Sequence, residues 1–484
     1  MLIIMSQESG PPSQSSISAI LYLLDCPLYR GGLRMTAEGL ESKKGSTFPE
    51  TEGIYWLYRQ PQAHWLQWQA RARALLAAQD KQTTLLAEER AVLPPDASPL
   101  TENRLELLRE GRLHNRKVYS EILAPLLKVQ EGEGGGPKGD QLQWTASLAE
   151  SLPSHQNMAS YHEVLFRDWA WENGENKAAF DLLQRLWLGK DYGSKSGLPM
   201  GDKVVAVLGS GAGRLAVDLH HHFKPKASLL IDINPLLHLA AHRLIRGESF
   251  QLYEFPHPPL SHEQVAVAQL CENPYGPQPD MHLLFADVSQ LPLKPQSLDV
   301  VVTPWLIDII PEDLPSFIRR VNRVLKQGGL WLNFGPLGFE TRSLAQRLCF
   351  AEVKELLEQS GFALEVDFQE RVPYLQSPHS SHGRVETVFC FRGKKLKEVK
   401  EPKRFDYLPS WLRDWAEPIP VTNFTAELAL INKVHYEITA IIDGRVSFSE
   451  IALAMEQNYG MTRSQAEETL FSILLKVHES SLRI

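Results

Sequence analysis

The residues best suited to chemistry in this chain are a glycine-rich loop and three carboxylates that follow apolar runs. The loop, Gly209-Ser210-Gly211-Ala212-Gly213, lies between the apolar run 204–208 and a helical pattern. Asp232 and Asp287 come directly after apolar runs, and Asp308 comes shortly after a third. Glycines let the backbone approach a ligand that side chains would block, and a carboxylate at a strand end can accept both hydroxyls of a ribose. This combination predicts a nucleoside-bearing ligand.

Two classes of cofactor bind through such a unit of strand, glycine loop, helix, strand and acid: dinucleotides and S-adenosylmethionine. The GxGxxG form of the dinucleotide fold needs a third glycine at Leu215 or Ala216, and neither position holds one. The GxGxG spacing found here is the form usual in S-adenosylmethionine methyltransferases. A tight strand-to-helix turn without a ligand stays an alternative, because a glycine loop alone is a weak signal.

The elements that must position these residues follow one another as in an α/β fold. A helix is expected over 311–325 from its apolar periodicity, and Gly328 and Gly329 should end it. The expected strands are apolar runs: 204–208, 227–231, 283–286, 298–303 and 330–334. This order, over roughly residues 200 to 335, resembles the Rossmann-like α/β core of class I methyltransferases. In such a fold the ligand lies at the carboxyl ends of the parallel strands.

The length of 484 residues predicts several domains, since one hydrophobic core does not grow to that size. The expected parts are a disordered leader (1–16), a small strand-rich module (17–58), a helical region (60–130), a Gly-rich linker (131–140), the α/β domain (141–393), a charged linker (394–420) and a small helical domain (421–484).

Composition limits the partners. There are 50 basic and 58 acidic residues, so the formal net charge is −8, which argues against a nucleic-acid partner. Four scattered cysteines without a CxxC pair indicate reduced thiols, and no apolar run is long enough for a membrane span. A cytoplasmic protein without a membrane partner is expected.

Both ends of the chain resemble known small modules. Residues 17–58 resemble the zinc-ribbon-like activator that accompanies some tRNA and release-factor methyltransferases, with Cys26-Pro27 in place. Tyr29 stands where the next cysteine belongs, and no cysteine occurs in 40–45. Structural zinc takes four ligands, so we expect a metal-free remnant. A generic three-stranded module is the alternative.

Residues 441–479 resemble a winged-helix module and, more closely, the peptide-binding domain of pyrroloquinoline-quinone biosynthesis. This resemblance implies a peptide or protein partner. A dimerisation or packing domain is the alternative.

A dense aromatic and charged stretch precedes the core at 161–176. Arg167 and Trp169 within it are candidates for the wall of the cofactor pocket. Aromatic packing between a helix and the sheet would account for the same stretch.

Four segments together resemble carnosine N-methyltransferase and its relatives: the FRDW segment 166–169, LGSGAGRLA at 208–216, Ile307-Asp308, and KQGGLWLNFGPL at 326–337. The resemblance covers residues 160–393. It implies that the methionine part of the cofactor is held by Gly209, Gly211, Gly213 and Arg214. It further implies the ribose for Asp232, the adenine for Asp287 with Val288, and the acceptor for Asp308.

The chain departs from this family where the acceptor binds. The family has a histidine shortly after GPL and tyrosines in the closing strand, whereas this chain has Gly338-Phe339-Glu340 and 383–388 without tyrosine. Tyr374, His379 and His382 are candidate substitutes. The methyltransferase interpretation survives these departures, but the carnosine substrate does not follow.

Asp308 is the candidate catalytic residue. Its carboxylate could accept an N–H of the acceptor, so that the opposite nitrogen points at the methyl group. A helix cap near Pro311 is the alternative. The expected function is S-adenosylmethionine-dependent N-methylation of a small peptide-like, imidazole or amine substrate. Methylation of protein or RNA, and a non-catalytic adaptor that retains the fold, remain the alternatives.

Overall fold

The computed structural model describes residues 17–128, 158, 162–189, 200–339, 343–401, 410 and 416–482, except for residues 38, 419, 422 and 444. The chain divides into two units, Met1–Pro402 and Lys403–Ile484. The expected leader (1–16) and the Gly-rich linker (131–140) lie outside the described residues.

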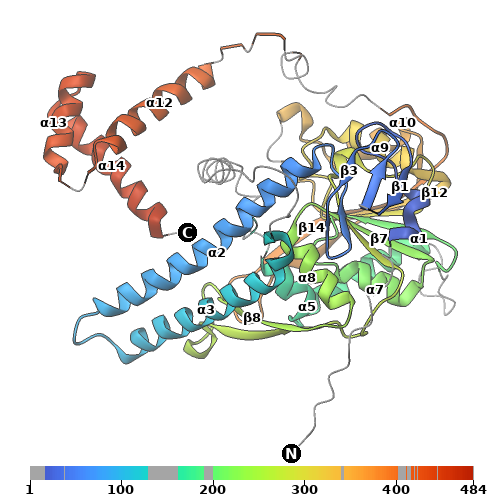
Figure 1. The fold of residues 1–484 in the computed structure, drawn as a ribbon, viewed down its shortest axis with the longest axis horizontal. Helices are drawn as coiled ribbons and strands as arrows, with labels where there is room; N and C mark the ends of the chain where they lie inside the picture. Colours follow the sequence, from blue (N-terminus) through green and yellow to red (C-terminus); the bar gives the residue numbers. More distant parts are fainter. Residues whose placement is uncertain are drawn as a thin grey trace, which may run out of the picture. The chain divides into compact units, whose positions relative to one another are not determined.

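A sheet lies at the centre of the first unit (Figure 1). It has nine strands in the order β13-β14-β12-β11-β6-β7-β10-β5-β4. Its strands are β4 (Glu50–Thr51), β5 (Ile54–Trp56), β6 (Val204–Leu208), β7 (Ala227–Asp232), β10 (Met281–Phe285), β11 (Leu298–Pro304), β12 (Leu325–Phe334), β13 (Phe362–Tyr374) and β14 (Arg384–Lys395). All neighbours from β12 to β5 are parallel, while β4, β13 and β14 pair antiparallel. Chain order reverses at β6, and ligands bind at such a switch point.

Apolar side chains on both faces of this sheet build two cores, which explains why β6 and β10 are buried along their whole length. One core contains residues of α2 (Pro61–Ala91), α3 (Pro99–Leu127), α5 (His162–Trp169), α6 (Glu175–Leu188), α7 (Arg214–Phe223) and α8 (Pro235–Ile245). The other contains residues of α1 (Ile17–Ile20), α9 (Leu314–Val324) and α10 (Phe350–Gln359). Helices on both faces of a largely parallel sheet confirm the predicted Rossmann-like α/β fold.

The N-terminal residues are built into the same unit. β1 (Leu33–Thr36), β2 (Gly39–Ser42) and β3 (Thr47–Phe48) form a three-stranded antiparallel sheet. β5 instead joins the main sheet beside β10, with Tyr55 opposite Leu284 and Trp56 opposite Phe285. After β5 the chain enters the long α2–α3 pair, which extends beyond the sheet in Figure 1. In the part of the chain that the structure describes, no group of three or more His, Cys, Asp or Glu side chains could hold a metal ion.

Two boundaries differ from the sequence expectation. The helix expected over 311–325 begins at Leu314, because the Asp313 side chain accepts the Ser316 N–H and caps it. The strand expected at 330–334 already begins at Leu325, so the glycine pair lies inside β12. The register between β11 and β12 shifts between Leu298 and Val300, which accommodates these glycines.

A small two-stranded sheet of β8 (Phe250–Glu254) and β9 (Val267–Cys271) lies apart from the main one. The second unit contains α12 (Asn423–Ala440), α13 (Phe448–Tyr459) and α14 (Arg463–Leu482). Its core is small: Ile438, Ile451, Ala452, Met455, Ala466 and Leu470. Among the described helices, none has an apolar stretch that could cross a bilayer.

A buried ion-pair network joins α9 to the end of the first unit. The Arg320 Nε donates to Glu312 Oε2 at 2.6 Å, and its Nη1 donates to Glu401 Oε1 at 2.7 Å. Glu401 also pairs with Arg30 at 2.8 Å. The side chains of Arg320 and Glu312 are 4% and 2% exposed, so neither charge has solvent to replace its partner.

We therefore expect Arg320→Ala to destabilise the protein by about 3–5 kcal/mol, since it leaves the Glu312 carboxylate buried without its cation. The unfolding midpoint in urea measures this loss. Arg90→Ala is the matched control, because the Arg90–Glu102 pair is exposed on both sides and its removal should move the midpoint little. If the two variants lowered the unfolding midpoint equally, the buried Arg320–Glu312 pair would contribute no more to stability than an exposed pair.

Candidate functional site

The glycine loop between β6 and α7 has a backbone that needs glycine. Gly209 and Gly213 have φ angles of 65° and 90°, in the left-handed region. A Cβ on Gly209 would lie 2.8 Å from Leu306 Cδ1, closer than side chains approach one another. Gly213 is the residue before α7, and a Cβ there would lie 3.3 Å from Leu230 and Ala241. The loop, which follows the carboxyl end of β6, is thus packed closely against Leu306, Leu230 and Ala241.

Asp232, at the end of β7, holds this loop in place. Its Oδ2 accepts the Gly211 N–H at 2.8 Å, and its Oδ1 accepts the Asn234 N–H at 2.9 Å. A carboxylate has about four acceptor positions, so two remain for a ligand. The predicted ribose-binding acid therefore lies directly beside the middle glycine of the loop.

Asp287 follows β10, the strand next to β7 in the sheet. Its Oδ1 accepts the Ser289 N–H at 2.8 Å and starts a short 3₁₀ helix. Val288 is buried, and its side chain belongs to the core on the α9 face of the sheet. The structure thus places Asp232 and Asp287 on adjacent strand ends, as the sequence predicted.

The helix α5 covers the glycine loop. Trp169 Nε1 donates to the Ala212 carbonyl at 2.9 Å, and Val164 Cγ1 lies 3.7 Å from where a Gly211 Cβ would be. Arg214 links the same elements, because its Nη1 donates to the Asp168 carbonyl at 3.0 Å. The predicted pocket residue Trp169 thus belongs to the loop's immediate surroundings.

Two arginines of this region have protein partners. Arg214 Nε donates to Asp218 at 2.9 Å, and Arg167 pairs with Asp168 at 2.7 Å. Burial acts to lower the pKa of Arg167, but the Asp168 carboxylate and Tyr374 outweigh it and raise that pKa. Arg167 therefore stays charged, and its side chain is 19% exposed.

Asp308 lies beyond β11 and is 6% exposed. Its Oδ2 accepts the Gly338 N–H at 2.9 Å, which joins the segments that follow the parallel strands β11 and β12. The alternative that Asp308 caps the next helix is wrong, since Asp313 does so.

The hairpin β13–β14 forms a wall beside this edge. Trp305 Nε1 donates to Glu386 Oε2 at 2.8 Å, and the rings of Trp305 and Tyr374 are 5.4 Å apart. Arg384 pairs with Glu386 at 2.9 Å and lies over the Tyr374 ring at 4.6 Å. We call Trp305, Tyr374, Arg384 and Glu386 the hairpin wall. His379 contacts Gln264 instead, and His382 is exposed, so of the three candidate substitutes Tyr374 alone belongs to this wall.

Two buried carboxylates fix the tip of the hairpin. Glu175, the first residue of α6, accepts the N–H groups of Leu375 and Gln376 at 2.9 and 2.7 Å. Glu254 on β8 accepts Trp171 Nε1 at 2.9 Å and also bonds Ser377. The wall is therefore fastened to α6 and β8, far from it in the sequence.

Several buried polar atoms around the loop have no protein partner: Tyr58 Oη, Ser210 Oγ, Asn234 Nδ2 and Gln290 Oε1. Native proteins rarely leave such groups unpaired, and a polar, nucleoside-bearing ligand would supply partners for these four. Sequence analysis missed these residues. Three lie within three positions of a predicted glycine or acid, whereas Tyr58 lies about 150 residues away and gave no signal.

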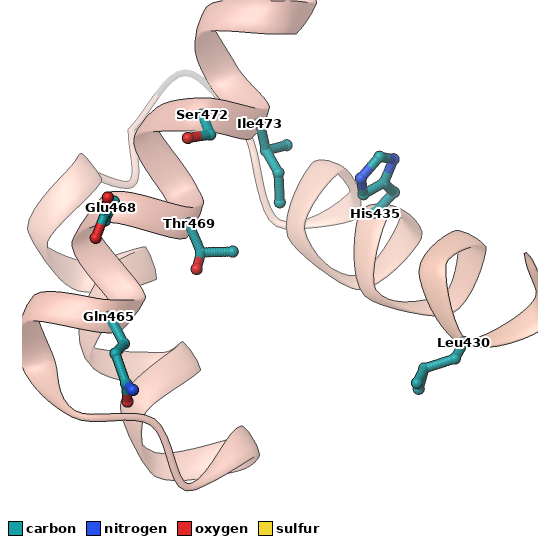
Figure 2. Close-up of a pocket in the computed structure, with 7 residues that line it drawn as sticks. All are labelled: Leu430, His435, Gln465, Glu468, Thr469, Ser472 and Ile473. Carbon is teal, nitrogen blue, oxygen red and sulfur yellow. The ribbon is translucent and has the colours of Figure 1, made fainter. Parts of the chain in front are cut away.

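A separate hollow of about 540 Å³ lies in the second unit. Figure 2 shows its lining, with residues of α12 facing residues of α14. The lining residues are Leu430, His435, Gln465, Glu468, Thr469, Ser472 and Ile473.

Asp232→Ala should destabilise the ligand-free protein by about 2–4 kcal/mol, since two backbone N–H groups lose a charged acceptor. Thermal or urea unfolding without ligand measures this. Asp287→Ala is the control, because it removes one such bond and should cost about half as much. An Asp232→Ala variant as stable as the parent would show that the carboxylate does not hold the loop.

Part of this chain is similar to known proteins. A family model described as carnosine N-methyltransferase matches residues 148–385. Carnosine N-methyltransferase of Rattus norvegicus is 28% identical over 286 residues, which are 54% of this chain and 68% of the rat protein. Carnosine N-methyltransferase unmet of Drosophila melanogaster is 23% identical, over 50% of this chain and 56% of the fly protein.

Among solved structures, the YcgJ protein of Bacillus subtilis matches with a TM-score of 0.31 and 11% identity, covering 46% of this chain and 99% of that one. The family match covers the segment that carries the glycine loop and the three carboxylates. Over this segment the chain is similar to the carnosine N-methyltransferases, and it is an S-adenosylmethionine-dependent methyltransferase with a Rossmann-like fold.

Proposed function

We propose that this protein transfers a methyl group from S-adenosylmethionine to an imidazole or amine nitrogen of a small peptide-like acceptor. The observation that carries the proposal is the loop bound to Asp232, with Asp287 on the next strand and unpartnered polar atoms beside both. The segment that matches the family includes all of these except Tyr58.

The cofactor, when bound, supplies an electrophilic methyl group on a sulfonium. In this proposal the free acceptor positions of Asp232 bind the ribose hydroxyls and Asp287 binds the adenine, with Val288 beside it. The backbone of Gly209, Gly211 and Gly213 borders the methionine part. Arg214 and Trp169 support this end of the pocket by holding α5 against the loop. Arg167, which pairs with Asp168, is proposed as a further residue of the pocket wall.

The acceptor side of the proposal rests on Asp308 and the hairpin wall. Asp308 accepts the Gly338 N–H through Oδ2, and in this proposal the same carboxylate also orients an acceptor N–H at this edge of the sheet. The wall adds the rings of Trp305 and Tyr374, while Glu386 accepts the Trp305 Nε1–H and pairs with Arg384, so in this proposal the acceptor packs against the aromatic rings. The family's histidine after GPL and the tyrosines of its closing strand are absent here, so the acceptor is proposed as a relative of carnosine in chemistry and not as carnosine itself.

The alternatives make different demands. A non-catalytic adaptor would not need acids at three strand ends. In an adaptor, a buried polar atom without a partner would lower the stability of the fold and no ligand would compensate for it. The net charge of −8 speaks against RNA as acceptor, though not against protein. Four free cysteines support the further proposal of a cytoplasmic enzyme that acts without a membrane or nucleic-acid partner.

For the C-terminal unit we keep the proposal of a peptide or protein partner. It is supported by the hollow between α12 and α14 and by exposed apolar residues on the same helices: Leu430, Tyr436, Phe471 and Leu475.

Calorimetric titration with S-adenosylhomocysteine tests the cofactor, with Asp232→Ala as the comparison variant. The parent should bind with 1:1 stoichiometry, and the variant should bind at least tenfold more weakly because charged hydrogen bonds to the ribose are lost. A screen of imidazole- and amine-containing dipeptides with labelled S-adenosylmethionine then tests the acceptor. A parent protein that binds no S-adenosylhomocysteine would refute the proposal.

Asp308→Asn should lower turnover about a hundredfold, since the charge that orients the acceptor N–H is lost. The fold should persist, because the amide oxygen can still accept the Gly338 N–H. Affinity for S-adenosylhomocysteine should stay within about a factor of three of the parent. Asp313→Asn, the same change at the cap of α9, serves as control and should leave turnover unchanged. Normal turnover in Asp308→Asn would assign Asp308 to loop structure alone.

A further inference from the structure

Tyr58 occupies an unusual place at the carboxyl edge of the sheet. β5 is parallel to β10, Trp56 lies opposite Phe285, and the Leu57 N–H donates to the Phe285 carbonyl at 2.8 Å. Tyr58 and Asp287 each follow the last residue of their strand by two positions, so both lie just beyond the carboxyl ends of β5 and β10. The N-terminal part of the chain thereby reaches the strand ends where the candidate cofactor site lies.

The side chain of Tyr58 lies on the same face of the sheet as the two nucleoside-binding candidates. Side chains alternate along a strand, so Asp232 shares a face with Leu230 on β7. Tyr58 and Asp287 lie beyond the ends of β5 and β10, and the charges of Asp232 and Asp287 both act on Tyr58. Trp56, Phe285 and Leu230 all belong to one core cluster, and Tyr58 belongs to it as well. Tyr55 belongs to the cluster on the opposite face.

The Tyr58 ring is packed inside the protein, but its hydroxyl makes no hydrogen bond to the protein. The residue is 3% exposed, and its ring stacks on that of His64 at 4.3 Å. The Oη atom is buried and has no hydrogen-bond partner in the protein. Burial raises the pKa of Tyr58 well above its usual value, and the charges of Asp287 and Asp232 raise it further. The hydroxyl therefore keeps its proton and can donate it in a hydrogen bond.

We propose that Tyr58 is a nucleoside-binding residue, and that the N-terminal segment thus completes a cofactor site otherwise built from residues after 160. The inference rests on the proposed function, because a nucleoside held by Asp232 and Asp287 brings ribose oxygens and adenine nitrogens to this edge. The Tyr58 hydroxyl donates to one of these acceptors and the ligand supplies the partner that the protein lacks.

Tyr58→Phe tests this inference, with Tyr55→Phe as the matched control. Calorimetry with S-adenosylhomocysteine should show Kd raised about three- to tenfold for Tyr58→Phe, which is the loss expected for one neutral hydrogen bond. The same factor should appear with 5′-methylthioadenosine, which lacks the amino-acid part. Tyr55→Phe should leave both constants unchanged, since that ring faces the other core. The unfolding temperature of ligand-free Tyr58→Phe should not fall, because the hydroxyl has no partner to lose.

Distinct outcomes separate the two proposals. If the parent protein binds neither ligand, the proposed function fails. If the parent binds but Tyr58→Phe binds equally well, an ordered water satisfies the hydroxyl and the inference is overturned. It is also overturned if ligand-free Tyr58→Phe unfolds at a lower temperature, or if S-adenosylhomocysteine alone loses affinity.

Discussion

The hydrogen bond from the Gly211 amide to the Asp232 carboxylate is the constraint on which the site depends. It crosses from the loop after β6 to the end of β7, so it fixes a segment whose glycines would otherwise sample many conformations. Trp169 holds the same loop from the other side through the Ala212 carbonyl. The loop is thus held between the end of β7 and α5. Its backbone and the two remaining acceptor positions of Asp232 can then contact the same ligand. Asp287 reaches the same place because β10 is the next strand in the sheet.

The rest of the site is assembled from segments far apart in the chain. The hairpin wall comes from β13 and β14 and is fastened by Glu175 and Glu254, whose carboxylates bond groups at the hairpin tip. β5 brings the N-terminal segment to the opposite side of the sheet. Buried carboxylates are stable here because backbone and indole N–H groups satisfy them. The catalytic edge is thus bordered on both sides by polar contacts of long sequence separation.

The buried carboxylates have hydrogen-bond partners, whereas polar atoms of Ser210, Asn234 and Gln290 have none in the protein. Each lowers the stability of the ligand-free protein, since a buried polar group without a partner keeps its desolvation cost. Proteins tolerate such local conflicts at functional sites, where a ligand resolves them. This distinguishes an enzyme from an adaptor that merely keeps the fold.

The sequence alone determined the α/β fold and the positions of the glycine loop, Asp232, Asp287 and Asp308, because apolar runs and glycine spacing are local signals that tertiary contacts seldom override. It misjudged where α9 and β12 begin, since the Asp313 cap and the bulged register depend on neighbouring strands. It left Asp308 open between helix cap and site, and the capping of α9 by Asp313 excludes the first of these. Tyr58, Trp305 and Glu386 could not be recognised from the sequence. Their positions result from strand pairing and hairpin docking, which bring together residues more than 75 positions apart. Such long-range contacts produce no periodic pattern in the sequence.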